Sequence, residues 1–135
     1  MSALVQVNIK VGNNKLKTNN MVVERVTRSA TVSPVVRDSA NQLVTSVERM
    51  QQYKISFSSF SGLVTGDEIG IVLQTTGDNS SGADFLELST IRFINGSECV
   101  WTFSIPSNWT GTLIATAIHK NYGMKQIGYR YINLK

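Results

Sequence analysis

Few residues of this chain could do acid–base or nucleophilic chemistry. His119 is the only histidine and Cys99 the only cysteine among 135 residues. A Ser-His-Asp triad would need His119 as its base, yet the Gly-x-Ser-x-Gly elbow that presents such a serine is absent. A single histidine also excludes a multi-histidine zinc site and a His-Glu-x-x-His helix. We therefore expect His119, at a strand end beside Lys120, to be an ordinary surface histidine.

Carboxylates offer a second route to chemistry, because glycoside hydrolysis uses two that face each other across a cleft. Asp67-Glu68 falls in a turn, and Asp84 and Glu87 border a polar loop, so we expect these four side chains to be solvated. The loop 77–84 offers oxygen ligands to a cation but lacks the spacing and final acid of an EF-hand. No P-loop or GxGxxG motif occurs. The sequence thus predicts a protein that is not an enzyme and uses neither metal nor cofactor.

The elements that must position these residues are predicted to be β-strands. Apolar and polar residues alternate with a period of two in segments separated by turns every eight to twelve residues. The predicted strands are 5–11, 21–32 (ended by Pro34), 53–60, 68–74, 84–94, 97–105, 112–120 and 124–134. Residues 38–52 fit a strand, with a short turn of helix as the alternative. We expect one all-β domain over 1–135, a single antiparallel β-sandwich of about eight or nine strands, Ig-like or jelly-roll, with 1–20 as a partly flexible arm.

The segment 97–120 shows the clearest alternation. Asn95-Gly96 predicts a type I′ hairpin that joins 84–94 to 97–105, because both residues tolerate positive φ. We expect 97–105 and 112–120 to be neighbouring antiparallel strands. The core of this region is predicted to contain Cys99, as a reduced thiol, together with Trp101, Phe103 and Ile105.

Charge is segregated along the chain. Residues 1–60 carry a net charge of +5, residues 61–100 carry −5, and residues 101–135 carry +4. Such segregation favours contact between a basic and an acidic face of two copies, although folding could also mix the segments on one surface. As interface candidates the sequence offers a basic set and an acidic set: Lys10, Lys15, Lys17, Arg25 and Arg28, and Asp78, Asp84 and Glu87.

Two ligand-binding alternatives rest on aromatic residues. A carbohydrate-binding module or lectin would use Trp109 in a turn, with Tyr122 at the same end of the sandwich, to stack on a glycan. A single-stranded nucleic-acid binder would use a C-terminal set of rings and cations: Tyr122, Tyr129 and Tyr131 with Lys120, Lys125 and Arg130. The simpler interpretation is that the tyrosines of this set are ordinary strand residues whose hydroxyl groups contact water. Nucleic acid is therefore not the expected partner. No apolar run long enough to span a membrane occurs.

Residues 91–121, which include WTFSIPSNWTGTLIATA, resemble the last strands of Ig-like β-sandwich modules found in bacterial surface proteins and in virion proteins of tailed phages. The antibody-type disulfide and tyrosine corner are missing. The resemblance implies a structural or decoration protein that self-associates or docks on a capsid, tail or similar particle, and it supplies no catalytic residues. Because residues 1–12 show no secretion signal, the expected location is a virion or a cytoplasmic assembly site.

Overall fold

The computed structural model describes residues 29–76 and 85–135, and in these ranges every regular element is a β-strand. The strands are β1 (Thr31–Arg37), β2 (Leu43–Val44), β3 (Ser46–Val47), β4 (Gln52–Ser61), β5 (Glu68–Thr75), β6 (Phe85–Glu87), β7 (Ile91–Arg92), β8 (Trp101–Ser104), β9 (Thr112–His119) and β10 (Lys125–Leu134). The all-β prediction is confirmed. The described ranges alone contain ten strands, because 38–52 and 84–94 each contain two short strands, and no helical turn forms within 38–52.

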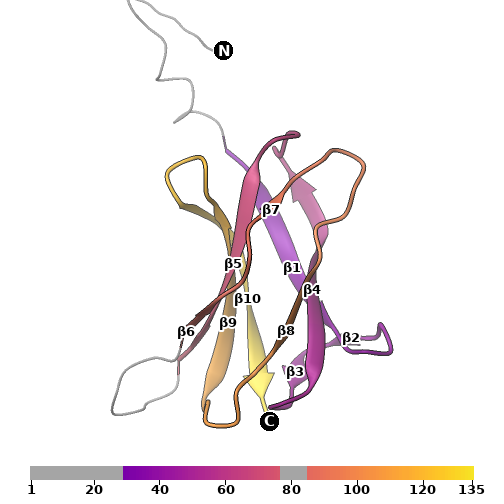
Figure 1. The fold of residues 1–135 in the computed structure, drawn as a ribbon, viewed down its shortest axis with the longest axis vertical. Helices are drawn as coiled ribbons and strands as arrows, with labels where there is room; N and C mark the ends of the chain where they lie inside the picture. Colours follow the sequence, from indigo (N-terminus) through magenta and orange to yellow (C-terminus); the bar gives the residue numbers. More distant parts are fainter. Residues whose placement is uncertain (1–28, 77–84) are drawn as a thin grey trace, which may run out of the picture.

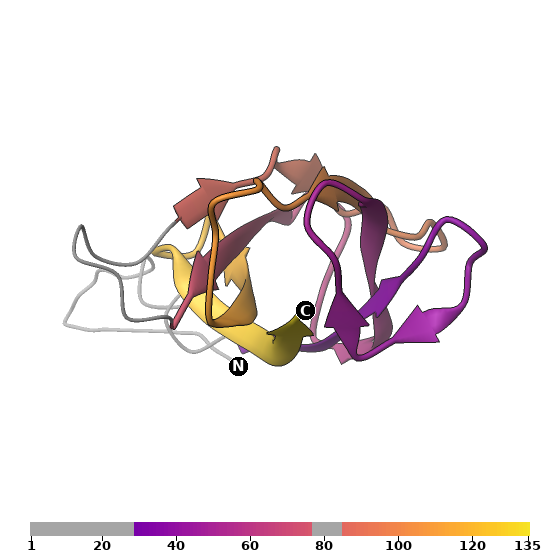
Figure 2. The ribbon, with the colours of Figure 1, turned by 90° about the horizontal axis from the view of Figure 1, so that it is seen from below.

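The strands form two sheets that pack as a sandwich (Figure 1). The smaller sheet has the order β2-β1-β4-β8, and the larger has the order β3-β10-β9-β5-β6, with β7 also paired to β5. Seen end-on, the two sheets curve around a common interior (Figure 2). One pairing departs from the expected antiparallel pattern, because β3 runs parallel to β10.

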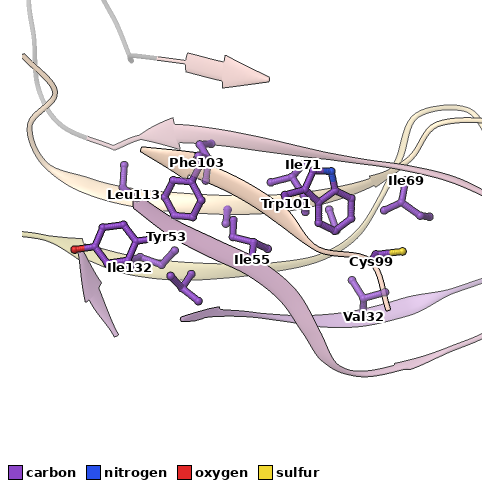
Figure 3. Close-up of a cluster of buried hydrophobic side chains, with 14 of the residues drawn as sticks. Val32, Tyr53, Ile55, Ile69, Ile71, Cys99, Trp101, Phe103, Leu113 and Ile132 are labelled. Carbon is purple, nitrogen blue, oxygen red and sulfur yellow. The ribbon is translucent and has the colours of Figure 1, made fainter. Parts of the chain in front are cut away.

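The core follows from the alternation that predicted the strands. In β9, Leu113, Ala115 and Ala117 are fully buried, whereas the residues between them are half-buried on the outer face. Side chains from both sheets meet in the interior (Figure 3), where Ile71 and Leu113 of the larger sheet lie opposite β4 and β8 of the smaller one. The four residues predicted for this core are all buried: Cys99, Trp101, Phe103 and Ile105.

The predicted hairpin at Asn95-Gly96 is wrong. The Ser97 N–H donates to the Ile94 carbonyl at 2.9 Å, and Gly96 has φ of 92° whereas Asn95 has negative φ, as in a type II turn. After this turn the chain crosses from the larger sheet to the smaller one, since β7 pairs with β5 and β8 pairs with β4. β8 and β9 therefore lie in opposite sheets and are not neighbours. Alternation shows which residues face the core but not which strand lies alongside.

Irregularities in two strands change the predicted faces. β1 continues through Pro34, which sits at a register shift rather than at the end of a strand. β10 has a register shift between Gln126 and Gly128, so Ile127 points inward while Tyr129 and Tyr131 point outward. A regular alternation would place these three on one face.

At Gly128, β10 approaches β1 so closely that a Cβ there would overlap the Val32 carbonyl oxygen. This contact closes one side of the sandwich, between the edges of the two sheets. The predicted strand 5–11, most of the predicted strand 21–32 and the arm 1–20 lie outside the described residues. Within the described ranges, no helix is long and apolar enough to cross a membrane.

Candidate functional site

The most unusual polar feature is a buried contact between Asp67 and His119. The Nε2 atom of His119 lies 3.2 Å from Oδ1 of Asp67, and the two side chains are only 5% and 2% exposed. The geometry at Nε2 does not meet that of a directed hydrogen bond, so the two side chains are in close polar contact without one. Both residues were predicted to be solvated, and both predictions are wrong. The reason is strand phase: Asp67 lies one residue before β5 and continues the inward phase of Ile69, and His119 is the last inward residue of β9.

This pair lies beneath three loops that meet at one end of the sandwich: the β4–β5 turn, the loop after β7, and the β9–β10 hairpin. Oδ2 of Asp67 accepts a hydrogen bond from the Val64 N–H at 2.9 Å. The Asp67 carbonyl accepts one from the Phe93 N–H at 2.7 Å. On the hairpin, the Tyr122 ring packs 4.6 Å from the His119 ring, centroid to centroid. Asp67 and His119 thus hold all three loops in one arrangement.

Further hydrogen bonds join the same loops directly. The Asn95 N–H donates to Oγ1 of Thr65 at 2.8 Å, which ties the loop after β7 to the β4–β5 turn. Oδ1 of Asn121 accepts from the Glu68 N–H at 3.1 Å, and its amide nitrogen donates to the Gly66 carbonyl at 3.4 Å. We call residues 60–68, 93–97 and 119–124 the loop end (Figure 1, top). Its three segments are joined to one another by these hydrogen bonds.

Apolar side chains project from this loop end. Phe60, Val64 and Ile94 are each about half exposed, at 48%, 51% and 52%. Phe60 packs edge-to-face on buried Phe93, with ring centroids 5.3 Å apart. Met124, in the hairpin, is also exposed. Rigid loops that carry exposed apolar residues are typical of protein-binding surfaces.

Trp109 and Tyr122 do not form the glycan site that the sequence offered. Trp109 is 5% exposed, so its ring has no free face for a sugar. Its carbonyl accepts a hydrogen bond from Nε of Arg49 at 2.6 Å, which fixes the turn over the core edge. Tyr122 packs on His119 beyond the other end of β9, so the full length of that strand separates the two rings.

Of the predicted interface residues, only Glu87 lies in the part of the chain that the structure describes. It projects from β6, and its Oε2 is 3.1 Å from Nζ of Lys120. The others lie outside the described residues: Lys10, Lys15, Lys17, Arg25, Arg28, Asp78 and Asp84.

The C-terminal rings and cations do not gather into one basic platform. Lys120 pairs with Glu87, and Nε of Arg130 donates to the Pro34 carbonyl across the sandwich. Tyr129 and Tyr131 are exposed on β10, but their planes stand at 89° to each other, so they offer no common stacking surface. Among residues 29–76 and 85–135, no group of three or more His, Cys, Asp or Glu side chains is placed to hold a metal ion.

Cys99 is a buried, free thiol. Its burial predicts how the stability of the fold depends on pH. Burial, and to a lesser degree the neighbouring Glu98 carboxylate, raises the pKa of the Cys99 thiol above its ordinary value of 9.0. The folded state therefore keeps this proton at a pH where the unfolded state releases it, so stability falls as the pH rises past the unfolded value.

We expect the Cys99→Ala variant to lose less free energy of unfolding than the wild type between about pH 8 and pH 10.5, because it lacks this thiol. Urea unfolding at the two pH values measures the difference. An identical loss in both proteins would contradict the prediction.

The chain has a distant structural likeness to a known protein. No protein-family model and no curated protein matches the chain. Among solved structures, the chain is similar to the superoxide reductase (neelaredoxin) from Ignicoccus hospitalis, with a TM-score of 0.44 and 14% identity over 82% of this chain and 86% of that chain. So distant a likeness bears on neither the activity nor the ligands of this chain.

Proposed function

We propose that the protein is a non-enzymatic structural module that docks on a larger protein particle through its loop end. The observation that carries the proposal is the set of half-exposed apolar residues Phe60, Val64 and Ile94, held on loops that the buried Asp67–His119 pair fixes. Because these loops are already ordered by internal contacts, docking costs little conformational entropy. The only histidine and the only cysteine of the chain both face the interior, which supports a role without catalysis.

The charges around the loop end favour a protein partner over a polyanion. Glu68 and Arg92 are exposed and of opposite sign, and they face each other as a cross-strand pair of β5 and β7. A polyanion surface would need a run of cations, whereas an apolar centre with a mixed polar rim is typical of protein–protein contacts.

Sequence and topology suggest the setting. Residues 91–121 resemble sandwich modules of phage virions. The orders β1-β4-β8 and β10-β9-β5 correspond to strands A-B-E and G-F-C of an immunoglobulin-type sandwich, which supports an Ig-like module. A virion is accordingly the particle that we propose.

Co-sedimentation tests this proposal. A tagged copy of the full chain, expressed in its source cells, should travel with the large particles in a sucrose gradient. The double variant Val64→Glu/Ile94→Glu should shift to the slow fractions, because two charges would be buried at the contact. Leu43→Glu is the matched control, since Leu43 is 61% exposed at the opposite end of β1. A wild-type chain found only in the slow fractions, or a double variant that stays with the particles, would overturn the proposal.

A further inference from the structure

We propose that two copies of the chain associate face to face through the outer surface of β10, β9, β5 and β6. This contact is separate from the loop end, because it uses the broad face of the larger sheet rather than its connecting loops. Two rows of side chains run across the face. The pairing registers give them as Tyr131-Ile114-Gln74-Phe85 and Tyr129-Thr116-Val72-Glu87.

The composition of this face differs from that of β4 and β8 in the smaller sheet. Tyr129, Tyr131 and Phe85 are each more than half exposed, at 55%, 59% and 59%. The outward residues of β4 and β8 are instead polar or charged, as in Lys54 and Thr102. Since the outer face of a solvated sheet is normally polar, the aromatic face of the larger sheet indicates a surface that is covered in the working protein.

Charge is nearly absent from the two rows. Glu87 is their only charged residue, and Lys120 neutralises it at 3.1 Å while also donating to Oγ1 of Thr90 at 2.9 Å. The Lys120 stem covers Gly70 on the same face. Depletion of charge with enrichment of tyrosine is the compositional mark of an interface core. Together with Lys120, the two rows carry no net charge, so two copies meet at these rows without charge repulsion.

The area of the face suits a weak dimer. The strands β10, β9, β5 and β6 have 10, 8, 8 and 3 residues. At a spacing of about 4.8 Å and a rise of about 3.4 Å per residue they cover roughly 470 Å². Two copies would bury about 1,000 Å², the size at which specific interfaces begin. We therefore expect a dissociation constant in the micromolar range.

The order of residues across the rows favours a second copy over an unrelated partner. A two-fold axis parallel to the strands, between β9 and β5, would place β10 of one copy over β6 of the other. Tyr131 of each copy would then contact Phe85 of the other, and Ile114 would contact Gln74. Ring thus meets ring at both ends of this row, and in the second row Tyr129 of each copy would contact Glu87 of the other, so every contact forms twice across the axis.

Sedimentation equilibrium of the full chain tests the proposal. The weight-average mass of the wild type should rise toward twice the monomer mass as concentration increases. Tyr131→Lys and Phe85→Glu should each weaken association at least tenfold, with unchanged far-UV circular dichroism. Thr102→Lys, an exposed position on the smaller sheet, should leave the mass curve unchanged.

Mixing the two variants tests the geometry itself. An equimolar mixture of Tyr131→Lys and Phe85→Glu should regain dimers, because one new ion pair and one native ring contact would form in each heterodimer. A wild type that stays monomeric at all concentrations would overturn the dimer. Variants that dimerise normally, or a mixture that does not recover, would overturn the paired arrangement.

Discussion

Replacing His119 by alanine is expected to lower the free energy of unfolding by about 3–5 kcal/mol, because it takes a polar neighbour from a buried carboxyl group and removes a buried ring. The change leaves the Asp67 carboxyl group in a region where it is 2% exposed, without the imidazole that lies 3.2 Å away. It also opens a cavity beside Tyr122, whose ring packs on His119. Urea unfolding followed by circular dichroism measures the loss.

A double-mutant cycle separates the contact from the cavity. His119→Ala and Asp67→Ala together should cost clearly less than the sum of the two single changes, because each single change removes the same contact. Glu68→Ala is the control, since that carboxylate is exposed one residue away and its loss should change stability by less than about 0.5 kcal/mol. Strict additivity at Asp67 and His119 would show that the pair contributes nothing as a pair.

Replacing Trp101 by alanine should cost about 3–5 kcal/mol, as for other large aromatic residues in a core. Trp101 is 2% exposed and packs on Phe57 with ring centroids 5.5 Å apart. Its Nε1–H donates to the Ser89 carbonyl at 2.7 Å, so the indole also ties the segment between β6 and β7 of the larger sheet to β8 of the smaller one. Alanine would remove the packing and leave that carbonyl without its donor.

The Trp101→Phe variant separates the loss of packing from the loss of the hydrogen bond to the Ser89 carbonyl. Phenylalanine keeps most of the apolar contact but cannot donate, so it should cost about 1 kcal/mol for the lost hydrogen bond plus a smaller packing term. Both variants are compared with wild type by urea unfolding. Equal destabilisation by alanine and phenylalanine would assign the whole role of Trp101 to the hydrogen bond.

Much of the strand pattern was predictable from the sequence, because a period of two specifies strands wherever it is regular. β4, β5, β9 and β10 all lie within one or two residues of their predicted ranges. The same alternation also places the Asp67–His119 pair on the buried face. Asp67 is in register with Ile69, and His119 follows Ala115 and Ala117, so both polar residues belong to the apolar face. Their phase in the strands, and not their charge, decides that Asp67 and His119 are buried.

The pairing of strands was not predictable in the same way. Type II geometry at Gly96 sends the chain to the opposite sheet, and nothing in the local residues distinguishes this from a hairpin. The register shift beside Gly128 turns Tyr129 and Tyr131 outward, although simple alternation groups them with Ile127. Tertiary contacts decide both features, and the exposed aromatic face follows from the second.

The position of β10 has a consequence for how the chain folds. This strand is the last one along the described chain, yet it lies between β3 and β9 and also touches β1 at Val32. Until β10 arrives, one edge of β9 stays unpaired, and contacts such as Gly128 with Val32 require closure of a very long loop. A fold dominated by such distant pairings reaches its native state in milliseconds to seconds rather than microseconds. The open edge of β9 is therefore a site at which the incompletely folded chain can aggregate until β10 has paired with it.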